Sequence, residues 1–137
     1  MRVDGLIINF RAGALVAARR IVQHDGSAGA IQATGPTDPL LGVSDLGAAS
    51  GAALDIRMGG IAPVDYGGAI SAGDPITSDA DGKAIAATAH THTENTAGAY
   101  AQNATTGGAS TVRIIGYAVV DGVDGDIGSV QIAPGQA

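Results

Sequence analysis

Two turn signals within residues 73–86 constrain the fold of this chain more than any other feature of its sequence. Gly73-Asp74-Pro75 favours a turn, because glycine permits positive φ and proline fixes φ and has no amide hydrogen. Asp81-Gly82 is a dipeptide that tight hairpins favour. The residues between and after these turns are β-prone, so the stretch predicts a hairpin. Because side chains alternate along a strand, we expect Ile76 and Ile85 to share one buried face.

Turn signals recur about every 8–12 residues along the chain, and no long segment has helical periodicity. The sequence therefore predicts an all-β fold, a small barrel or sandwich of short strands joined by glycine-rich turns. We expect one domain over residues 1–137. Within it, residues 1–10 form an extended N-terminal arm or a first strand, and residues 88–110 form a long loop or insertion. Residues 15–23 fit a short helix or a strand, and we favour the strand.

One segment occurs twice in the sequence. Residues 42–58 align without a gap with residues 116–132, so that Gly42 meets Gly116 and Gly51 meets Gly125. Both copies read as a strand, a turn of small residues and a second strand. Either glycine-rich hairpins resemble one another by chance, or the chain contains a pseudo-repeated hairpin.

The composition predicts a thin core. The chain has 22 glycines, one phenylalanine, no tryptophan and no cysteine, so its apolar residues are mainly small. Small side chains bury little area, and a chain of this kind gains stability from contacts with other subunits. We therefore expect an oligomer or attachment to a larger particle. Without cysteine the chain forms no disulfide.

The formal net charge of −6 argues against binding to nucleic acid or to an anionic membrane surface. No apolar run approaches the roughly 20 residues of a membrane-spanning helix. The first residues, Met1-Arg2-Val3-Asp4, lack the pattern of a signal peptide. We expect synthesis in the cytoplasm without export by a cleaved signal.

The strongest candidate for metal binding is His90-Thr91-His92, because both imidazoles would lie on one side of a strand. Glu94 could add a carboxylate, but His24 is the only further histidine, and a metal site needs three or four ligands. A solvated loop is the favoured interpretation. Asp79-Ala80-Asp81-Gly82 lacks the further ligands of a calcium loop and is better explained as a turn.

The sequence contains no recognisable catalytic set, nucleotide-binding loop or cofactor motif, and we expect a protein without enzymatic activity or cofactor. Six residues are candidates for an interface with another subunit or partner: Leu6, Ile7, Ile8, Phe10, Arg19 and Arg20. Leu6-Ile7-Ile8 could add a strand to the open edge of a neighbour, or simply pack in the core. Arg19-Arg20 could bind an acidic surface, or flank a strand as exposed charges.

The order of the turns resembles that of the capsid decoration proteins of tailed bacteriophages, also called cement or head-stabilising proteins. The matching segments are Arg11–Ala14, Arg20–Val22, Leu41–Ser44, Ser50–Gly51, Gly60–Val64, Gly68–Asp79, Gly82–Ala84, Ile115–Ala118, Gly125–Asp126 and Val130–Gly135. They cover most of the chain, except for the region from Thr88 to Ser110.

The resemblance implies a β-rich, usually trimeric protein on the outer surface of the virion head. It would bind the major capsid protein after the shell expands and bridge neighbouring capsid subunits. The family has no catalytic residues to transfer. As an alternative, residues 70–77 resemble the core of β-clip domains, which bind carbohydrates or partner proteins.

Overall fold

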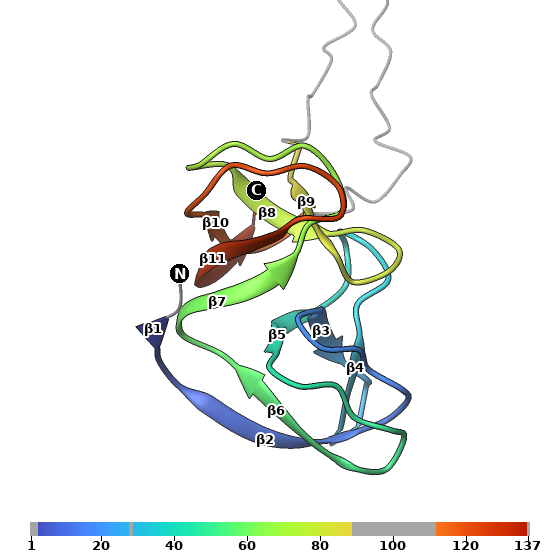
Figure 1. Ribbon diagram of the computed structural model, residues 1–137. Helices are drawn as coiled ribbons and strands as arrows, with labels where there is room; N and C mark the ends of the chain where they lie inside the picture. Colours follow the sequence, from blue (N-terminus) through green and yellow to red (C-terminus); the bar gives the residue numbers. More distant parts are fainter. Residues whose placement is uncertain (1–2, 28, 89–111, 137) are drawn as a thin grey trace, which may run out of the picture.

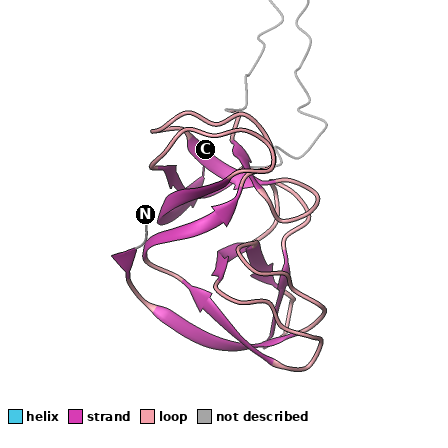
Figure 2. Cartoon of the chain, viewed as in Figure 1, coloured by secondary structure: helices cyan, strands magenta, loops and turns pink. Residues whose placement is uncertain are grey.

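The computed structural model describes residues 3–27, 29–88 and 112–136, and its strands account for all the regular secondary structure of this part of the chain (Figure 2). The strands are β1 (Val3–Asp4), β2 (Ile7–Ala12), β3 (Ile21–His24), β4 (Gly29–Gln32), β5 (Leu40–Ser44), β6 (Ala53–Arg57), β7 (Gly60–Asp65), β8 (Pro75–Ser78), β9 (Ala84–Ala86), β10 (Arg113–Ala118) and β11 (Ile127–Gln136). The predicted all-β class is confirmed.

Apart from β1, which belongs to the second group, the strands form two groups that follow each other along the chain (Figure 1). Strands β2-β4-β3-β5-β6 make a closed barrel. The other group is a sheet in the order β1-β7-β11-β10-β8-β9, with an added parallel bridge between Tyr66 and Ala84. β7 follows β6 after only two residues, Met58 and Gly59, so the two groups lie against each other at this crossing.

The two groups have the same strand pairing. Adding 54 to each residue number of the β3–β4 pair gives the β8–β9 pair, so that Val22↔Gln32 becomes Ile76↔Ala86. The same shift turns the parallel Ala12↔Ala30 pair of the barrel into the Tyr66↔Ala84 bridge. The sheet therefore repeats the barrel strand for strand, with β7 to β11 in the places of β2 to β6.

The predicted repeated hairpin is confirmed and is one part of this larger duplication. Adding 74 to the β5–β6 register gives the β10–β11 register, so that Ser44↔Ile56 becomes Ala118↔Val130. We call residues 7–58 the N-terminal repeat and residues 61–88 with 112–132 the C-terminal repeat. Residues related by these shifts, 54 up to position 33 and 74 from position 42, are called counterparts.

Each repeat has its own apolar cluster, and the two clusters differ in composition. The cluster of the N-terminal repeat contains Ala12, Val16, Val22, Ala30, Leu41, Leu54 and Ile56. The cluster of the C-terminal repeat contains Ala62, Val64, Tyr66, Ile70, Ile76, Ala84, Ile115, Ala118, Val130 and Ile132. This second cluster also takes in Ile21, Ala33 and Val43 from the N-terminal repeat. The outer side of β3 and β5 is therefore buried against the neighbouring repeat.

The β8–β9 hairpin forms as predicted, but its register differs from the expectation by one residue. Ser78 pairs with Ala84, which leaves five residues in the loop, and Ile85 consequently lies opposite Thr77. Residues opposite each other in an antiparallel pair point to the same face, so Ile76 and Ile85 lie on opposite faces. Ile76 is buried, whereas Ile85 is half-buried.

The expectation of a strand over residues 15–23 is correct only for its last part. β3 begins at Ile21, and the preceding residues form a loop held by paired hydrogen bonds between Val16 and Ala48. The N-terminal residues form two short strands, and β1 crosses to pair with β7 of the other repeat. The proposed insertion at 88–110 lies outside the described residues except for Thr88.

Candidate functional site

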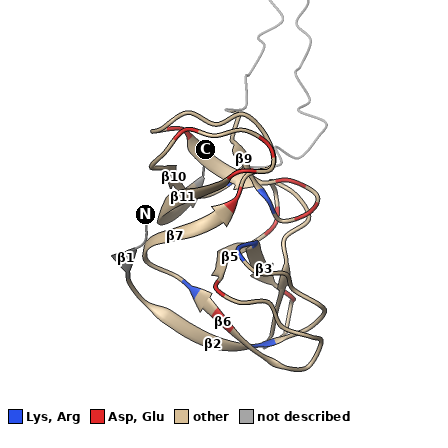
Figure 3. Cartoon of the chain, in the orientation of Figure 1, with Lys and Arg blue, Asp and Glu red and all other residues tan. Residues whose placement is uncertain are grey.

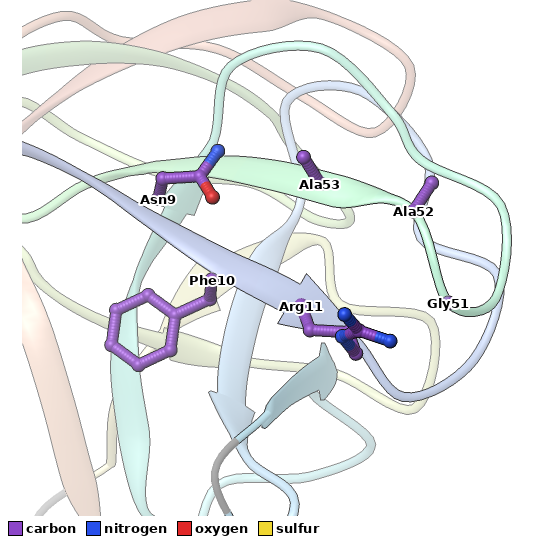
Figure 4. A pocket seen from close by; sticks show the side chains of 6 residues that line it. All are labelled: Asn9, Phe10, Arg11, Gly51, Ala52 and Ala53. Carbon is purple, nitrogen blue, oxygen red and sulfur yellow. The ribbon is translucent and has the colours of Figure 1, made fainter.

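Two adjoining surface pockets lie at the end of β2, and both are lined by Arg11. One pocket, of about 310 Å³, is lined by Arg11, Ala12, Gly13, Asp25, Ser27 and Gly29. The other, of about 120 Å³, is lined by Asn9, Phe10, Arg11, Gly51, Ala52 and Ala53 (Figure 4). Figure 4 shows Arg11 at the end of β2, beside the turn that carries Gly51. We call the larger cavity the Arg11 pocket.

One wall of the Arg11 pocket is a loop that Asp25 holds in place. Asp25 Oδ1 accepts hydrogen bonds from the Ser27 amide at 2.7 Å, the Ser27 hydroxyl at 3.0 Å and the Gly29 amide at 3.2 Å. Because these bonds favour the ionised carboxylate, chiefly those from Ser27, they lower the pKa of Asp25 below 3.8. The pocket is therefore lined by Arg11 and by a carboxylate that its own loop holds in place.

The counterpart of the Arg11 pocket in the C-terminal repeat is filled by the N-terminal repeat. This counterpart pocket has Asp65 in the place of Arg11. It also has a loop held by Asp79, whose Oδ1 accepts hydrogen bonds from the Asp81 and Lys83 amides. Asp65 Oδ1 lies 3.0 Å from Arg19 Nε, and Asp65 Oδ2 lies 3.2 Å from Arg20 Nε. Acidic side chains are frequent on the loops of this repeat (Figure 3).

Further hydrogen bonds complete this contact between the repeats. Arg20 Nη1 and Gln32 Nε2 both donate to the Asp81 carbonyl, at 2.8 and 2.7 Å. The backbones join as well, because the Ile21 amide donates to the Gly82 carbonyl and the Asp65 amide donates to the Arg19 carbonyl. Arg19 has a positive φ of 55°, a backbone conformation that is uncommon for residues other than glycine. Its counterpart in the C-terminal repeat is Gly73, which also has a positive φ. We call this set of contacts the repeat junction.

The six residues predicted for an interface divide into three environments. Leu6 and Ile7 are 58% and 42% exposed at the start of β2. Ile8 and Phe10 point to the barrel interior and are half-buried, with Phe10 packed on the core and 6.4 Å from the His24 ring. Arg19 and Arg20 make the repeat junction, so their carboxylate partner lies within the chain.

Other large apolar side chains are exposed at separate places. Leu15 and Leu46 lie in loops of the N-terminal repeat, and Val123, Ile127 and Tyr117 lie on the C-terminal repeat. Tyr117 is 45% exposed, although its counterpart Val43 is fully buried. The apolar surface is therefore distributed over both repeats.

The weak metal candidates His90 and His92, with Glu94, lie outside the described residues. Among the residues that the structure describes, no three histidine, aspartate or glutamate side chains are grouped as metal ligands would be. That part of the chain also has no helix of the length and apolarity needed to span a bilayer.

Sequence reasoning missed the Arg11 pocket, although a weak signal for it exists. Residues 7–33 align with residues 61–87, and Asp25 and Asp79 are matched in this alignment. Most other identities are alanine, glycine or isoleucine, which occur everywhere in this chain. Arg11 is matched with an aspartate, Asp65, so this position carries opposite charges in the two copies.

Comparisons with known proteins identify two similarities. A family model described as phage cement protein matches residues 3–116. Among solved structures, the chain is similar to the N base of the head fiber protein gp8.5 of bacteriophage phi29. The TM-score is 0.61 at 19% identity, and 93% of each chain is covered, so this likeness concerns the fold. No curated protein matches the chain.

Proposed function

Since this chain belongs to the phage cement protein family, we propose that it binds the outer surface of an expanded phage head and bridges neighbouring capsid subunits. The family gives the chain a structural role in the head of the virion rather than an enzymatic one. The family match, over residues 3–116, is the observation that carries the proposal. The major capsid protein is the proposed partner, and synthesis takes place in the host cytoplasm.

Exposed apolar side chains support a surface that binds another protein. Leu6 and Ile7 are both exposed and adjacent, and the segment they belong to passes from one repeat to the other. Removing such side chains from water on contact stabilises a complex by roughly 25 cal/mol per Å² of apolar area. We propose that Leu6 and Ile7 contact the shell and that Ile8 and Phe10 fix the strand that presents them. Arg19, whose side chain is 41% exposed while it binds Asp65, would lie at an edge of the contact, and Arg20 would support that edge through the repeat junction.

Three copies of the chain would bind together. Each copy contributes a modest contact, and linking three contacts raises the overall affinity without any new interaction. A protein that binds the expanded shell and not the unexpanded one stabilises the expanded shell by mass action against the pressure of the packaged DNA. A homotrimer therefore fits the role of a protein that holds a shell closed.

The proposal is tested by co-sedimentation of the purified chain with expanded heads that lack it. We expect the wild-type chain to pellet with expanded heads and not with unexpanded ones. The double variant Leu6→Ser, Ile7→Ser should reduce the bound fraction at least about ten-fold, because two apolar contacts are lost. Leu15→Ser, Leu46→Ser is the matched control, since these leucines are 76% and 74% exposed elsewhere.

Two outcomes would contradict the proposal. A wild-type chain that stays in the supernatant with expanded heads would remove the role itself. If a chain that does not bind heads instead binds a glycan specifically, the β-clip type of binding module would be favoured. Equal loss of head binding in the Leu6/Ile7 variant and in its control would refute only the assignment of these residues.

A further inference from the structure

The repeat junction joins one edge of the N-terminal repeat to a pocket of the C-terminal repeat. The edge consists of Arg19, Arg20 and Ile21 with Gln32, and the pocket is built around Asp65 and the loop of residues 79–83. Because the two repeats have the same fold, each repeat has both an edge and a pocket. Among residues 3–27, 29–88 and 112–136, only one of each is used within the chain, so the Arg11 pocket and the edge of the C-terminal repeat are left over.

The unused edge is formed by Gly73, Asp74 and Pro75, the counterparts of Arg19, Arg20 and Ile21. Burial differs between the two edges mainly at Ile21 and its counterpart Pro75, because Arg20 and Asp74 are both half-buried. Ile21 is fully buried in the junction, whereas Pro75 and Asp74 are only half-buried and Gly73 is exposed. The C-terminal edge thus has the shape of the N-terminal edge without a repeat packed on it.

The charges of the two unused surfaces are complementary, with the sign reversed relative to the junction. Within the chain a positive edge, Arg20, meets a negative pocket, Asp65. On the unused surfaces the edge residue is Asp74, and the pocket contains Arg11 together with Asp25, whose carboxylate is bound to its own loop as that of Asp79 is in the junction. An edge of one chain can therefore approach the pocket of another with the same geometry and an opposite pair of charges. Such complementarity favours this pairing over others, because like charges in contact are costly.

We propose that the Gly73–Pro75 edge of one copy of this chain docks into the Arg11 pocket of a second copy. The contact between chains would have the orientation of the contact between repeats, with Asp74 bound to Arg11 in place of the Arg20–Asp65 pair. The side-chain bonds of Arg20 and Gln32 to the Asp81 carbonyl have no equivalent, because their counterparts are Asp74 and Ala86. Pro75 has no amide hydrogen, so the hydrogen bond that Ile21 donates to Gly82 has no equivalent there. Tyr117, next to Pro75 on the paired strand, would become buried as its counterpart Val43 is.

The contact is head-to-tail, because the edge and the pocket are different surfaces. A head-to-tail contact closes into a ring or continues as a filament, and a ring of three chains would contain six repeats. This inference rests on the self-association included in the proposed function, and it names the surfaces that carry it. It requires no contact with a capsid.

The test is the molar mass of the purified chain, measured by light scattering behind a sizing column over a range of concentrations. We expect a mass of several chains for the wild type. Arg11→Asp and Asp74→Arg should each raise the dissociation concentration at least about ten-fold, because each places like charges in contact. The double variant Arg11→Asp, Asp74→Arg should restore association, since it recreates the polarity of the Arg20–Asp65 pair.

Arg113→Asp and Asp124→Arg are matched controls, because these side chains are exposed elsewhere and the changes in net charge are the same. Both should keep the wild-type mass. A single-chain mass for the wild type at all concentrations, or no recovery in the double variant, would overturn the proposal. Since the measurement contains no heads, its failure is separate from a failure of head binding.

Discussion

The two repeats have the same backbone pairing but fill their cores in different ways. The C-terminal repeat has Tyr66 in its centre, lying over Gly122 and Gly128, where an added Cβ would overlap the tyrosine ring. The counterparts of Tyr66 and Gly128 are Ala12 and Leu54, so in the N-terminal repeat the large side chain comes from β6, the strand paired with β2. The combined volume of the two side chains is therefore similar in both repeats, but a different strand supplies the large one.

This difference shows that the strand register, not any particular core residue, is what the two repeats share. Both have glycine at the position of close strand approach, Gly42 and Gly116, where a Cβ would overlap a carbonyl oxygen of the partner strand. The large and the small side chain can change places between core positions as long as the interior stays filled. The outer surfaces differ even more, because one repeat is acidic where the other carries Arg11.

The largest expected effect comes from emptying the C-terminal core. Tyr66→Ala removes a fully buried ring and its hydrogen bond to the Val120 carbonyl, 2.8 Å away. We expect the free energy of unfolding to fall by about 3–5 kcal/mol in chemical denaturation. Adding Gly128→Leu reproduces the Ala12 and Leu54 arrangement and should recover part of the loss. A double variant no more stable than Tyr66→Ala would show that the two cores are not interchangeable.

A smaller loss is expected from the repeat junction. Asp65→Asn removes the carboxylate that both Arg19 and Arg20 bind, and its side chain is only 19% exposed. We expect a loss of about 1.5–3 kcal/mol, the usual range for hydrogen bonds to charged groups. Asp55→Asn is the control, because Asp55 is exposed and accepts one bond, from Asn9. Equal losses would mean that the junction adds little to stability.

The same denaturation experiment tests the expectation of a single domain. If the repeats depend on each other through the shared cluster of Ile21, Ala33 and Val43, the wild-type chain unfolds in one cooperative transition. Two separate transitions would show that each repeat is a domain of its own.

Alkaline pH should destabilise the folded chain through Tyr66. Burial raises the pKa of Tyr66 above 10.0, so the folded chain holds this proton more tightly than the unfolded chain. The contribution to stability is complete below pH 10 and is lost as pH rises through the raised pKa, by at most about 1.4 kcal/mol per pH unit. Tyr66→Phe should remove this fall, measured as unfolding midpoints between pH 8 and about 11.5. An identical fall in both proteins would contradict the assignment to Tyr66.

The smallest effect is expected at Arg19, where the repeats differ in backbone strain. Arg19 has φ of 55°, and replacing it with glycine, as at Gly73, relieves about 1–2 kcal/mol of strain. The change also removes an ion pair whose arginine is 41% exposed, worth about 0.2–1 kcal/mol. Arg19→Gly should therefore change stability by no more than about 1 kcal/mol. A loss well above this would show that the Arg19 side chain does more than offset its strain.

The sequence predicted the parts of this structure that depend on local turn chemistry. The hairpin after Gly73-Asp74-Pro75 and the repeated hairpin at residues 42–58 and 116–132 are present. The register of Ile76 and Ile85 was predicted wrongly, because Asp79 accepts bonds from two amides and holds a loop of five residues. Turn signals alone do not give loop length.

The remaining features depend on contacts between distant residues and could not be predicted. Nothing local distinguishes Arg11, which is left exposed, from Arg20, which binds Asp65 far along the chain. The full duplication could not be recognised in the sequence either. The two repeats share the hydrogen-bonded pairing of their strands, whereas their side chains have diverged. Only the structure shows that Arg20 lies on the edge that makes the repeat junction, whereas Arg11 lies in the pocket that is the counterpart of the Asp65 pocket.

The most direct test of the central claim, that this chain reinforces an expanded phage head, is the temperature at which heads release their DNA. Heads lacking the protein are compared with the same heads saturated with the wild-type chain. The account predicts that the added chain raises the release temperature and that Leu6→Ser, Ile7→Ser raises it less. An unchanged release temperature at full occupancy would contradict a stabilising role.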